Sequence, residues 1–152
     1  MILRSQKRTS GGSVLLEALV GILIFSIGIL ALVAMQAESI RNTSEAKYRN
    51  DASYLANQII GRMWADRVKA DGSNNLGSYA HRTGGTVCNP SGASSAYGSV
   101  TDWLADVTAT LPNAPASKQQ ITVGANNLVT VTLCWQTGST SHNLVVSAQI
   151  QG

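Results

Sequence analysis

The pattern of apolar and polar positions begins with one long apolar run close to the N-terminus. No charged side chain occurs in residues 18–35, whose sequence is ALVGILIFSIGILALVAM. At about 1.5 Å per residue, a helix of this length nearly spans the hydrocarbon core of a bilayer. An ordinary secretory signal has a shorter apolar region, of about 7 to 15 residues, and is followed by a small-residue cleavage motif that is missing here. The pattern therefore predicts a transmembrane helix.

Beyond this run the apolar positions repeat every three or four residues, which is the spacing of one helix face. We predict one helix from about Val14 to Val68, roughly 80 Å long, with Gly72 as a stop signal. Glu45 and Arg49 are expected to pair on its other face. The face that repeats should pack against a sheet, and it consists of Ala52, Leu55, Ala56, Ile59, Ile60, Met63 and Trp64.

A segment without clear periodicity follows, at 69–101, and is rich in Gly, Ser and Asn. We interpret it as a long connection, which could bear function or could simply cross from the helix to a sheet. Residues 101–111 then predict a short second helix, with Thr101 as the N-cap and Pro112 just after its end. Its apolar face would hold Trp103, Leu104, Val107 and Leu111.

Three strand candidates complete the chain, at 119–123, 128–135 and 143–150, and all are rich in Val, Ile, Leu and Thr. The turn-forming segments between them predict an antiparallel meander. In the middle strand, apolar residues alternate with Thr and Cys, so one face should cover the long helix. The predicted fold class is α+β, in which a long N-terminal transmembrane helix continues into an exported domain and packs on a C-terminal antiparallel sheet.

Charge is distributed unevenly along the chain and indicates its orientation. Arg4, Lys7 and Arg8 precede the apolar run, and the eight basic residues that remain balance eight acidic ones. The positive-inside bias places the N-terminus in the cytoplasm and the C-terminal part outside. Balanced charge after the leader argues against nucleic-acid binding as the main activity, because such binding uses clustered Lys and Arg.

Only two cysteines occur, Cys88 and Cys134, and both lie in the part predicted to be exported. A single disulfide is the natural interpretation, with Cys134 on the sheet face opposite Trp135. Closing this loop would contribute about 4 kcal/mol in the chain-entropy model. Together with His81 and His142, the cysteines could instead form a Cys2His2 set in a membrane-tethered metal-binding protein.

That metal-binding alternative has little sequence support. Six and seven residues separate each His from its nearest Cys, unlike compact zinc motifs. We therefore expect the two histidines to be surface loop residues, and we expect no metal or other cofactor. The chain also lacks G-x-S-x-G, H-E-x-x-H and P-loop sequences, so we predict that it is not an enzyme.

Two features distinguish the N-terminus from a generic anchor. Gly11 and Gly12 precede the apolar run, and Glu17 is a lone carboxylate at its start. A carboxylate in a lipid-facing helix costs a few kcal/mol, so it is usually neutralised or paired, and it is by default a functional hypothesis. The alternative is that Glu17 lies at the level of the lipid headgroups.

The stretch GGSVLLEALVGILIFSIGILAL, after its basic leader, resembles the class III signal of type IV pilins and pseudopilins. The resemblance implies that prepilin peptidase cuts between Gly12 and Ser13 and that Ser13 becomes N-methylated. It also makes Glu17 the acid of the fifth mature position, which can pair with the Ser13 α-amine of its own or a neighbouring subunit. The chain departs from the common pattern in having Ser13 as the first mature residue and Gly11 where Lys or Arg is usual.

Within this family, the segments LANQIIGRMWAD and LCWQ look like the type IV pilus modification proteins, a group of minor pilins. The resemblance implies a leader at 1–12, a transmembrane half-helix at 13–37 and an exported domain at 38–152. The chain would cross the inner membrane once and later reach the pilus or cell surface. Its partners would be prepilin peptidase, other minor and major pilins, the inner-membrane assembly machinery and membrane lipid. A minor pseudopilin of a type II secretion system, or a DNA-uptake pilus component, is the alternative function.

Overall fold

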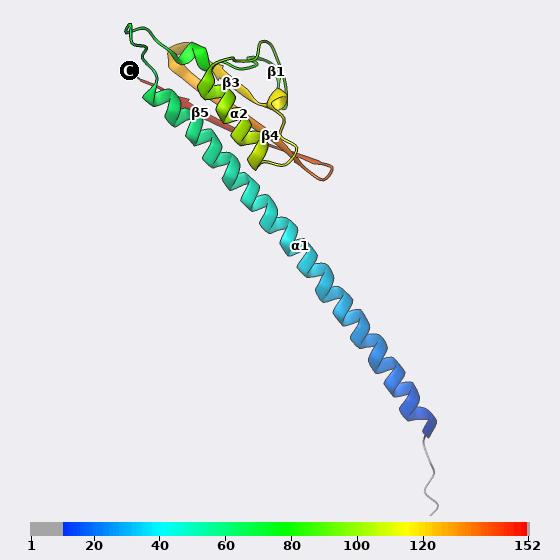
Figure 1. Cartoon of the computed structure of the whole chain (residues 1–152). Helices are drawn as coiled ribbons and strands as arrows, with labels where there is room; N and C mark the ends of the chain where they lie inside the picture. Colours follow the sequence, from blue (N-terminus) through cyan, green and yellow to red (C-terminus); the bar gives the residue numbers. More distant parts are fainter. Residues whose placement is uncertain (1–10, 152) are drawn as a thin grey trace, which may run out of the picture. The chain divides into compact units, whose positions relative to one another are not determined.

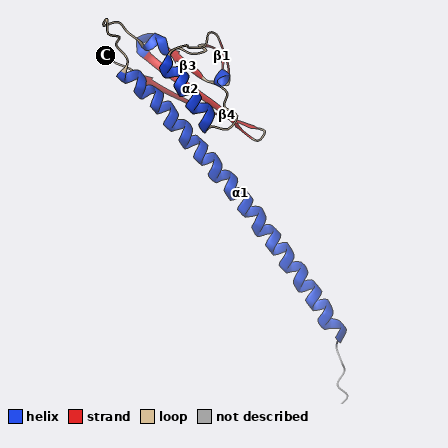
Figure 2. Cartoon of the chain, in the orientation of Figure 1, coloured by secondary structure: helices blue, strands red, loops and turns tan. Residues whose placement is uncertain are grey.

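The computed structural model describes residues 11–151 of the chain (Figure 1). The predicted leader therefore lies almost entirely outside the described residues. The chain forms two compact units, the first ending at Thr43 and the second beginning at Ser44. We refer to the second as the C-terminal unit. The layout is α+β, with a long apolar N-terminal helix and a C-terminal antiparallel sheet, as predicted (Figure 2).

The first helix, α1, spans Gly11–Ala65, so it begins and ends about one turn earlier than predicted. The chain leaves the helix after Ala65, and the side-chain amide of Asn75 donates to the Asp66 carbonyl oxygen at 3.1 Å. Val68, the predicted helix end, instead forms an isolated antiparallel bridge with Asn74. Gly72 makes the intervening reversal with a φ of 83°, a conformation that residues other than glycine rarely adopt.

The sheet is the predicted meander, with its strands in the order β3-β4-β5. Strand β3 spans Gln120–Val123, β4 spans Leu128–Thr137 and β5 spans Thr140–Gln149. Both pairs of neighbours are antiparallel, and the β4–β5 register continues without a bulge from Leu128↔Gln149 to Thr137↔Thr140. The hairpin is tighter than predicted because a two-residue turn suffices when its first residue, Gly138, has a φ of 60°.

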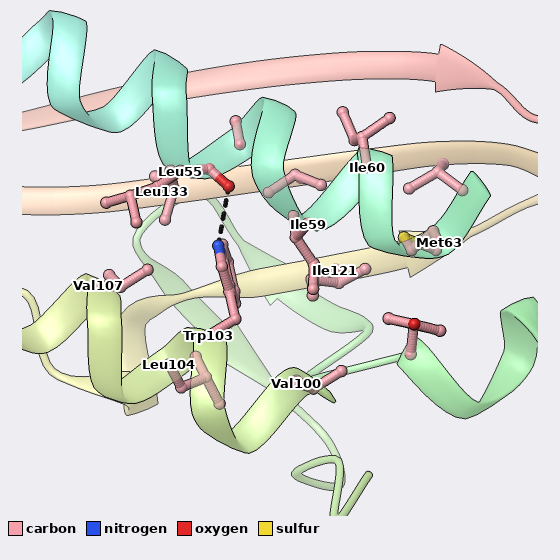
Figure 3. Packing of buried hydrophobic residues seen from close by; sticks show 14 of the residues in the cluster. Leu55, Ile59, Ile60, Met63, Val100, Trp103, Leu104, Val107, Ile121 and Leu133 are labelled. Carbon is pink, nitrogen blue, oxygen red and sulfur yellow. Dashed lines mark hydrogen bonds between the residues drawn. The ribbon is translucent and has the colours of Figure 1, made fainter. Parts of the chain in front are cut away.

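The core of the C-terminal unit lies where α1 and a second helix, α2 (Gly98–Thr110), pack on the sheet (Figure 3). The indole nitrogen of Trp103 donates to the Leu55 carbonyl oxygen at 2.9 Å, so a polar contact joins the two helices inside the core. Side chains from both helices converge on Ile121 and Leu133 of the sheet. The repeating face of α1 is buried as predicted at Ala52, Leu55, Ala56, Ile59, Ile60 and Met63.

Trp64 is the exception on that face, because its side chain is 39% exposed. The adjacent pairs Leu55/Ala56 and Ile59/Ile60 are both buried, whereas Trp64 lies one residue before the end of α1 at Ala65. Met63 is fully buried, and Trp64 lies at the margin, where the Arg67 guanidinium is 6.0 Å from its ring centroid. The sequence prediction of core packing was wrong for Trp64.

Helix α2 spans Gly98–Thr110 and begins earlier than predicted. The residue before it is Tyr97, and Thr101 lies inside the first turn, where its hydroxyl donates to the Gly98 carbonyl oxygen at 2.9 Å. Thr101 is therefore not the N-cap. Gly98 and its neighbour Ser99 are weak helix formers, and burial of the fully enclosed Val100 holds this extra turn in place.

The predicted long connection contains short regular elements that its sequence did not reveal. A 3₁₀ turn, η1, spans Leu76–Tyr79, and strands β1 (Gly84–Thr86) and β2 (Asn89–Ser91) form an antiparallel hairpin. At Gly85, a Cβ would lie 2.5 Å from the Asn89 carbonyl oxygen, so the hairpin requires glycine there. Two more 3₁₀ turns, η2 (Ala116–Lys118) and η3 (Ala125–Asn127), flank β3.

Candidate functional site

The described residues of the first unit, 11–43, all belong to α1 and include its apolar run. Its large apolar side chains between Val14 and Met35 are between 44% and 72% exposed. Among the described residues, α1 is the one helix long and apolar enough to span a membrane. Burying so much apolar surface, in lipid or against other helices, is strongly favourable at about 25 cal/mol per Å².

The predicted processing and assembly residues lie at the start of this helix. Gly12, Ser13 and Glu17 all belong to α1, so the bond between Gly12 and Ser13 is inside its first turn. Ser13 and Glu17 are four residues apart and therefore share a helix face, with an axial rise of about 6 Å between them. The Glu17 side chain is exposed within an apolar surface. A cut before Ser13 would create an α-amine one turn from this carboxylate.

The predicted disulfide is present and joins the hairpin to the sheet. Cys88 lies between β1 and β2 with a φ of 62°, and its Cα atom is 5.5 Å from that of Cys134 on β4. Cys134 is buried on the face opposite Trp135, where the sequence placed it. The bridge therefore holds the β1–β2 hairpin over the sheet face that α1 does not cover.

A buried glutamine that the sequence analysis did not identify forms hydrogen bonds with the backbone of Cys134. Gln119 is fully buried, its side-chain oxygen accepts from the Cys134 amide at 2.8 Å, and its side-chain amide donates to the Cys134 carbonyl at 3.0 Å. These two bonds replace the ladder contacts that a longer β3 would make. A glutamine directly before a strand carries no distinctive signal, so sequence reasoning missed it.

His81 is a buried residue and not the surface loop residue that we predicted. It is 1% exposed, its Nδ1 accepts from the Ser95 amide at 3.1 Å, and its Nε2 lies 3.1 Å from the Ala116 carbonyl oxygen. The neutral tautomer with hydrogen on Nε2 satisfies both contacts. Burial lowers the pKa of His81, because charging the ring in this site is unfavourable.

His142 also differs from the prediction, since it lies on β5 and its side chain is only 9% exposed. Its ring stacks on Trp135 with centroids 5.6 Å apart, and its Nε2 is 3.8 Å from the Glu45 carboxylate. Glu45 thus contacts the sheet, and the expected pair with Arg49 is not among the ion pairs of residues 11–151.

The proposed Cys2His2 set does not form a common site. Both cysteines are joined in the disulfide, and both ring nitrogens of His81 contact backbone groups. Within the described part of the chain, no cluster of three or more His, Cys, Asp or Glu residues is placed to hold a metal ion.

Asp66 organises a second polar cluster that the sequence did not predict. Its Oδ2 accepts from the Tyr79 hydroxyl at 3.0 Å, from the Asn75 side-chain amide at 3.0 Å, and from the Tyr97 hydroxyl. The rings of Tyr79 and Tyr97 meet edge to face, with centroids 5.0 Å apart. Burial raises the pKa of Tyr79 to about 12, and the hydrogen bond to Asp66 contributes in the same direction. The cluster fastens the end of α1 to η1 and to the start of α2.

Comparisons with protein-family models, curated protein sequences and solved structures find no match to this chain. The functional assignment therefore depends on its own residues and their geometry.

Proposed function

We propose that this chain is a minor subunit of a type IV pilus, of the kind called type IV pilus modification protein PilV. In this proposal, prepilin peptidase removes residues 1–12 at the cytoplasmic side of the inner membrane. The mature chain then leaves the bilayer and enters an assembly through α1. The observation that carries the proposal is Glu17, a carboxylate one helical turn after Ser13 in the apolar, exposed N-terminal part of α1.

The physical basis is a change of environment for that helix. In the bilayer, lipid covers the apolar side chains of the first unit, and Glu17 is costly unless it is neutralised or paired. In a bundle of such helices, apolar packing replaces lipid, and a Ser13 α-amine from the same or a neighbouring subunit neutralises Glu17. Because a paired charge is stable only in a narrow range of geometry, the pair also selects the register between helices.

The C-terminal unit is consistent with a structural role outside the cytoplasm. It has its own core, and the disulfide between Cys88 and Cys134 suits an oxidising compartment. Its polar clusters at Asp66 and His81 are satisfied by neighbouring groups and serve packing. The proposed role needs packing and processing and involves no bond-making chemistry by this chain.

Substitution of Glu17 tests the proposal. Glu17→Ala should insert into the membrane normally, since it removes a costly charge, but its recovery in the assembled pilus fraction should fall by about tenfold, which corresponds to about 1.4 kcal/mol. Glu38→Ala is the matched control, because it removes the same charge from the same helix beyond the apolar run. Quantitative immunoblots of membrane and pilus fractions give both values. Normal assembly of the Glu17→Ala chain would refute the role of this carboxylate.

A further inference from the structure

The outer edge of β5 is an open row of backbone hydrogen-bonding groups. Residues flanking a two-residue hairpin turn exchange both of their hydrogen bonds, so Thr137 and Thr140 form such a pair. The pattern then alternates along β5, and even-numbered residues bond to β4. Ile150 agrees with this phase, since its amide donates to the Asn127 carbonyl at 3.1 Å. The amides and carbonyls that point away from the sheet belong to residues 141, 143, 145, 147 and 149.

The opposite edge of the sheet, along β3, is already paired with another segment of the chain. His81 and Ile121 exchange two backbone hydrogen bonds of 3.0 Å along β3. The side-chain amide of Gln120 also bonds to the carbonyls of Arg82 and Gly84, which hold the neighbouring segment against this edge. In the described part of the chain, no backbone hydrogen bond covers the outward groups of β5 in this way.

The β5 edge also lacks the usual protections against strand pairing. Proteins guard an exposed edge by making it short, by adding Lys or Pro, or by inserting a bulge. Strand β5 is ten residues long, its register with β4 is continuous, and no Asp, Glu, Lys or Arg occurs after Lys118. An unguarded edge of this length is a site where another strand can be added.

The side chains of β5 indicate what such a strand would cover. On the face toward the core, Leu144, Val146 and Ala148 are only partly buried although they pack against it. On the other face, Val145 is 49% exposed between polar neighbours. A strand added beside β5 would pair the outward backbone groups and complete the cover of Leu144 and Val146.

We propose that β5 receives a strand from a different subunit of the same assembly. That strand would be extended and uncharged, with apolar side chains beside Leu144 and Val146. A second copy of this chain fits less well, because its β3 edge is closed by His81. Antiparallel pairing of two β5 strands would reverse α1 of one copy relative to the other, whereas the proposed function has all copies entering from one membrane. The choice of partner rests on the proposed function, and strand addition rests on the edge alone.

Site-resolved hydrogen–deuterium exchange of the full chain tests this directly. In purified chain held in detergent, the amides of residues 141, 143, 145, 147 and 149 should exchange about tenfold or more faster than the even-numbered amides between them. In the envelope assembly, this alternation should disappear because the outward amides become protected. Outward amides that stay fast in the assembly would overturn strand addition. Protection that rises with concentration of the purified chain alone would identify a second copy as the occupant and overturn the choice of partner.

Two lysine substitutions distinguish the effect of a charge on the edge strand β5 from that of a charge on the inner strand β4. Ser147 and Thr130 are cross-strand neighbours whose hydroxyls lie 2.9 Å apart, so Ser147→Lys and Thr130→Lys lose the same contact on the same face. Only Ser147→Lys places a charge on the edge strand, and it should lower recovery in the assembly by about tenfold while Thr130→Lys does not. Equal recovery of both variants, with native thermal melting, would overturn the proposal. If Glu17→Ala assembles normally but the outward amides are protected, the role of Glu17 fails and strand addition stands. If Glu17→Ala fails to assemble but the outward amides of the parent chain stay fast in the assembly, strand addition fails and the role of Glu17 stands.

Discussion

At the residue scale, the C-terminal unit depends on a few buried polar side chains that form hydrogen bonds with backbone groups. Gln119 extends the pairing of β3 to Cys134, and His81 connects two loops through its ring nitrogens. A buried polar group without a partner costs about 1–3 kcal/mol, so each of these contacts must be complete. Neither residue could be predicted as buried from sequence, because His and Gln are mostly found at surfaces and their partners here are distant backbone groups.

His81 makes the stability of this unit depend on pH. Below the ordinary histidine pKa of about 6.5, the unfolded chain binds a proton that the folded chain, with its lowered pKa, binds less readily. The free energy of unfolding should therefore be greatest above this pH and fall as the pH decreases below it. Denaturant titrations of the full chain in detergent between about pH 7.5 and 5.5, followed by Trp fluorescence, measure this dependence.

Two asparagine variants show which histidine causes the pH dependence of stability. His81→Asn keeps an acceptor near the Ser95 amide but cannot titrate, so its stability should vary less with pH than that of the parent chain. His142→Asn removes the other histidine and should retain the dependence that His81 causes. If the free energy of unfolding of His81→Asn depends on pH as steeply as that of the parent chain, the pKa of His81 does not differ between the folded and unfolded chain.

At the element scale, the β1–β2 hairpin is held to the sheet by one covalent bond. The hairpin is short, polar and rich in glycine, with three residues in each strand. Isolated hairpins of this kind are at best marginally stable in water. The same features explain why sequence periodicity found β4 and the second half of α1 but not β1 and β2: short strands with exposed polar side chains have no apolar alternation to detect.

Removing the disulfide should therefore destabilise the C-terminal unit substantially. For cysteines 46 residues apart, the chain-entropy model gives about 4 kcal/mol. The double variant Cys88→Ala/Cys134→Ala should lose stability of this order in denaturant titrations. The parent chain should lose a similar amount under reductant, whereas the double variant should not respond to it. Thiol labelling of the folded parent chain without reductant would show that the bridge does not form.

At the scale of the whole molecule, some features of the two units follow from the sequence pattern, and others depend on the tertiary fold. The apolar half of α1 follows from composition alone, since eighteen uncharged residues in succession predict a helix long and apolar enough to span a membrane. The meander follows from alternation and turn residues. The boundaries of α2, the margin position of Trp64 and the open edge of β5 could not be predicted, because each depends on which neighbours the tertiary fold supplies.

In the proposed function, processing and assembly depend on the same few residues at the N-terminus. Removal of residues 1–12 would take away Arg4, Lys7 and Arg8 and create the α-amine that we propose as the partner of Glu17. The most direct test is intact-mass and N-terminal peptide mass spectrometry of the chain recovered from the pilus fraction. The account predicts a chain that begins at Ser13, either unmodified or one methyl group heavier. A chain in that fraction that still begins at Met1 would contradict it.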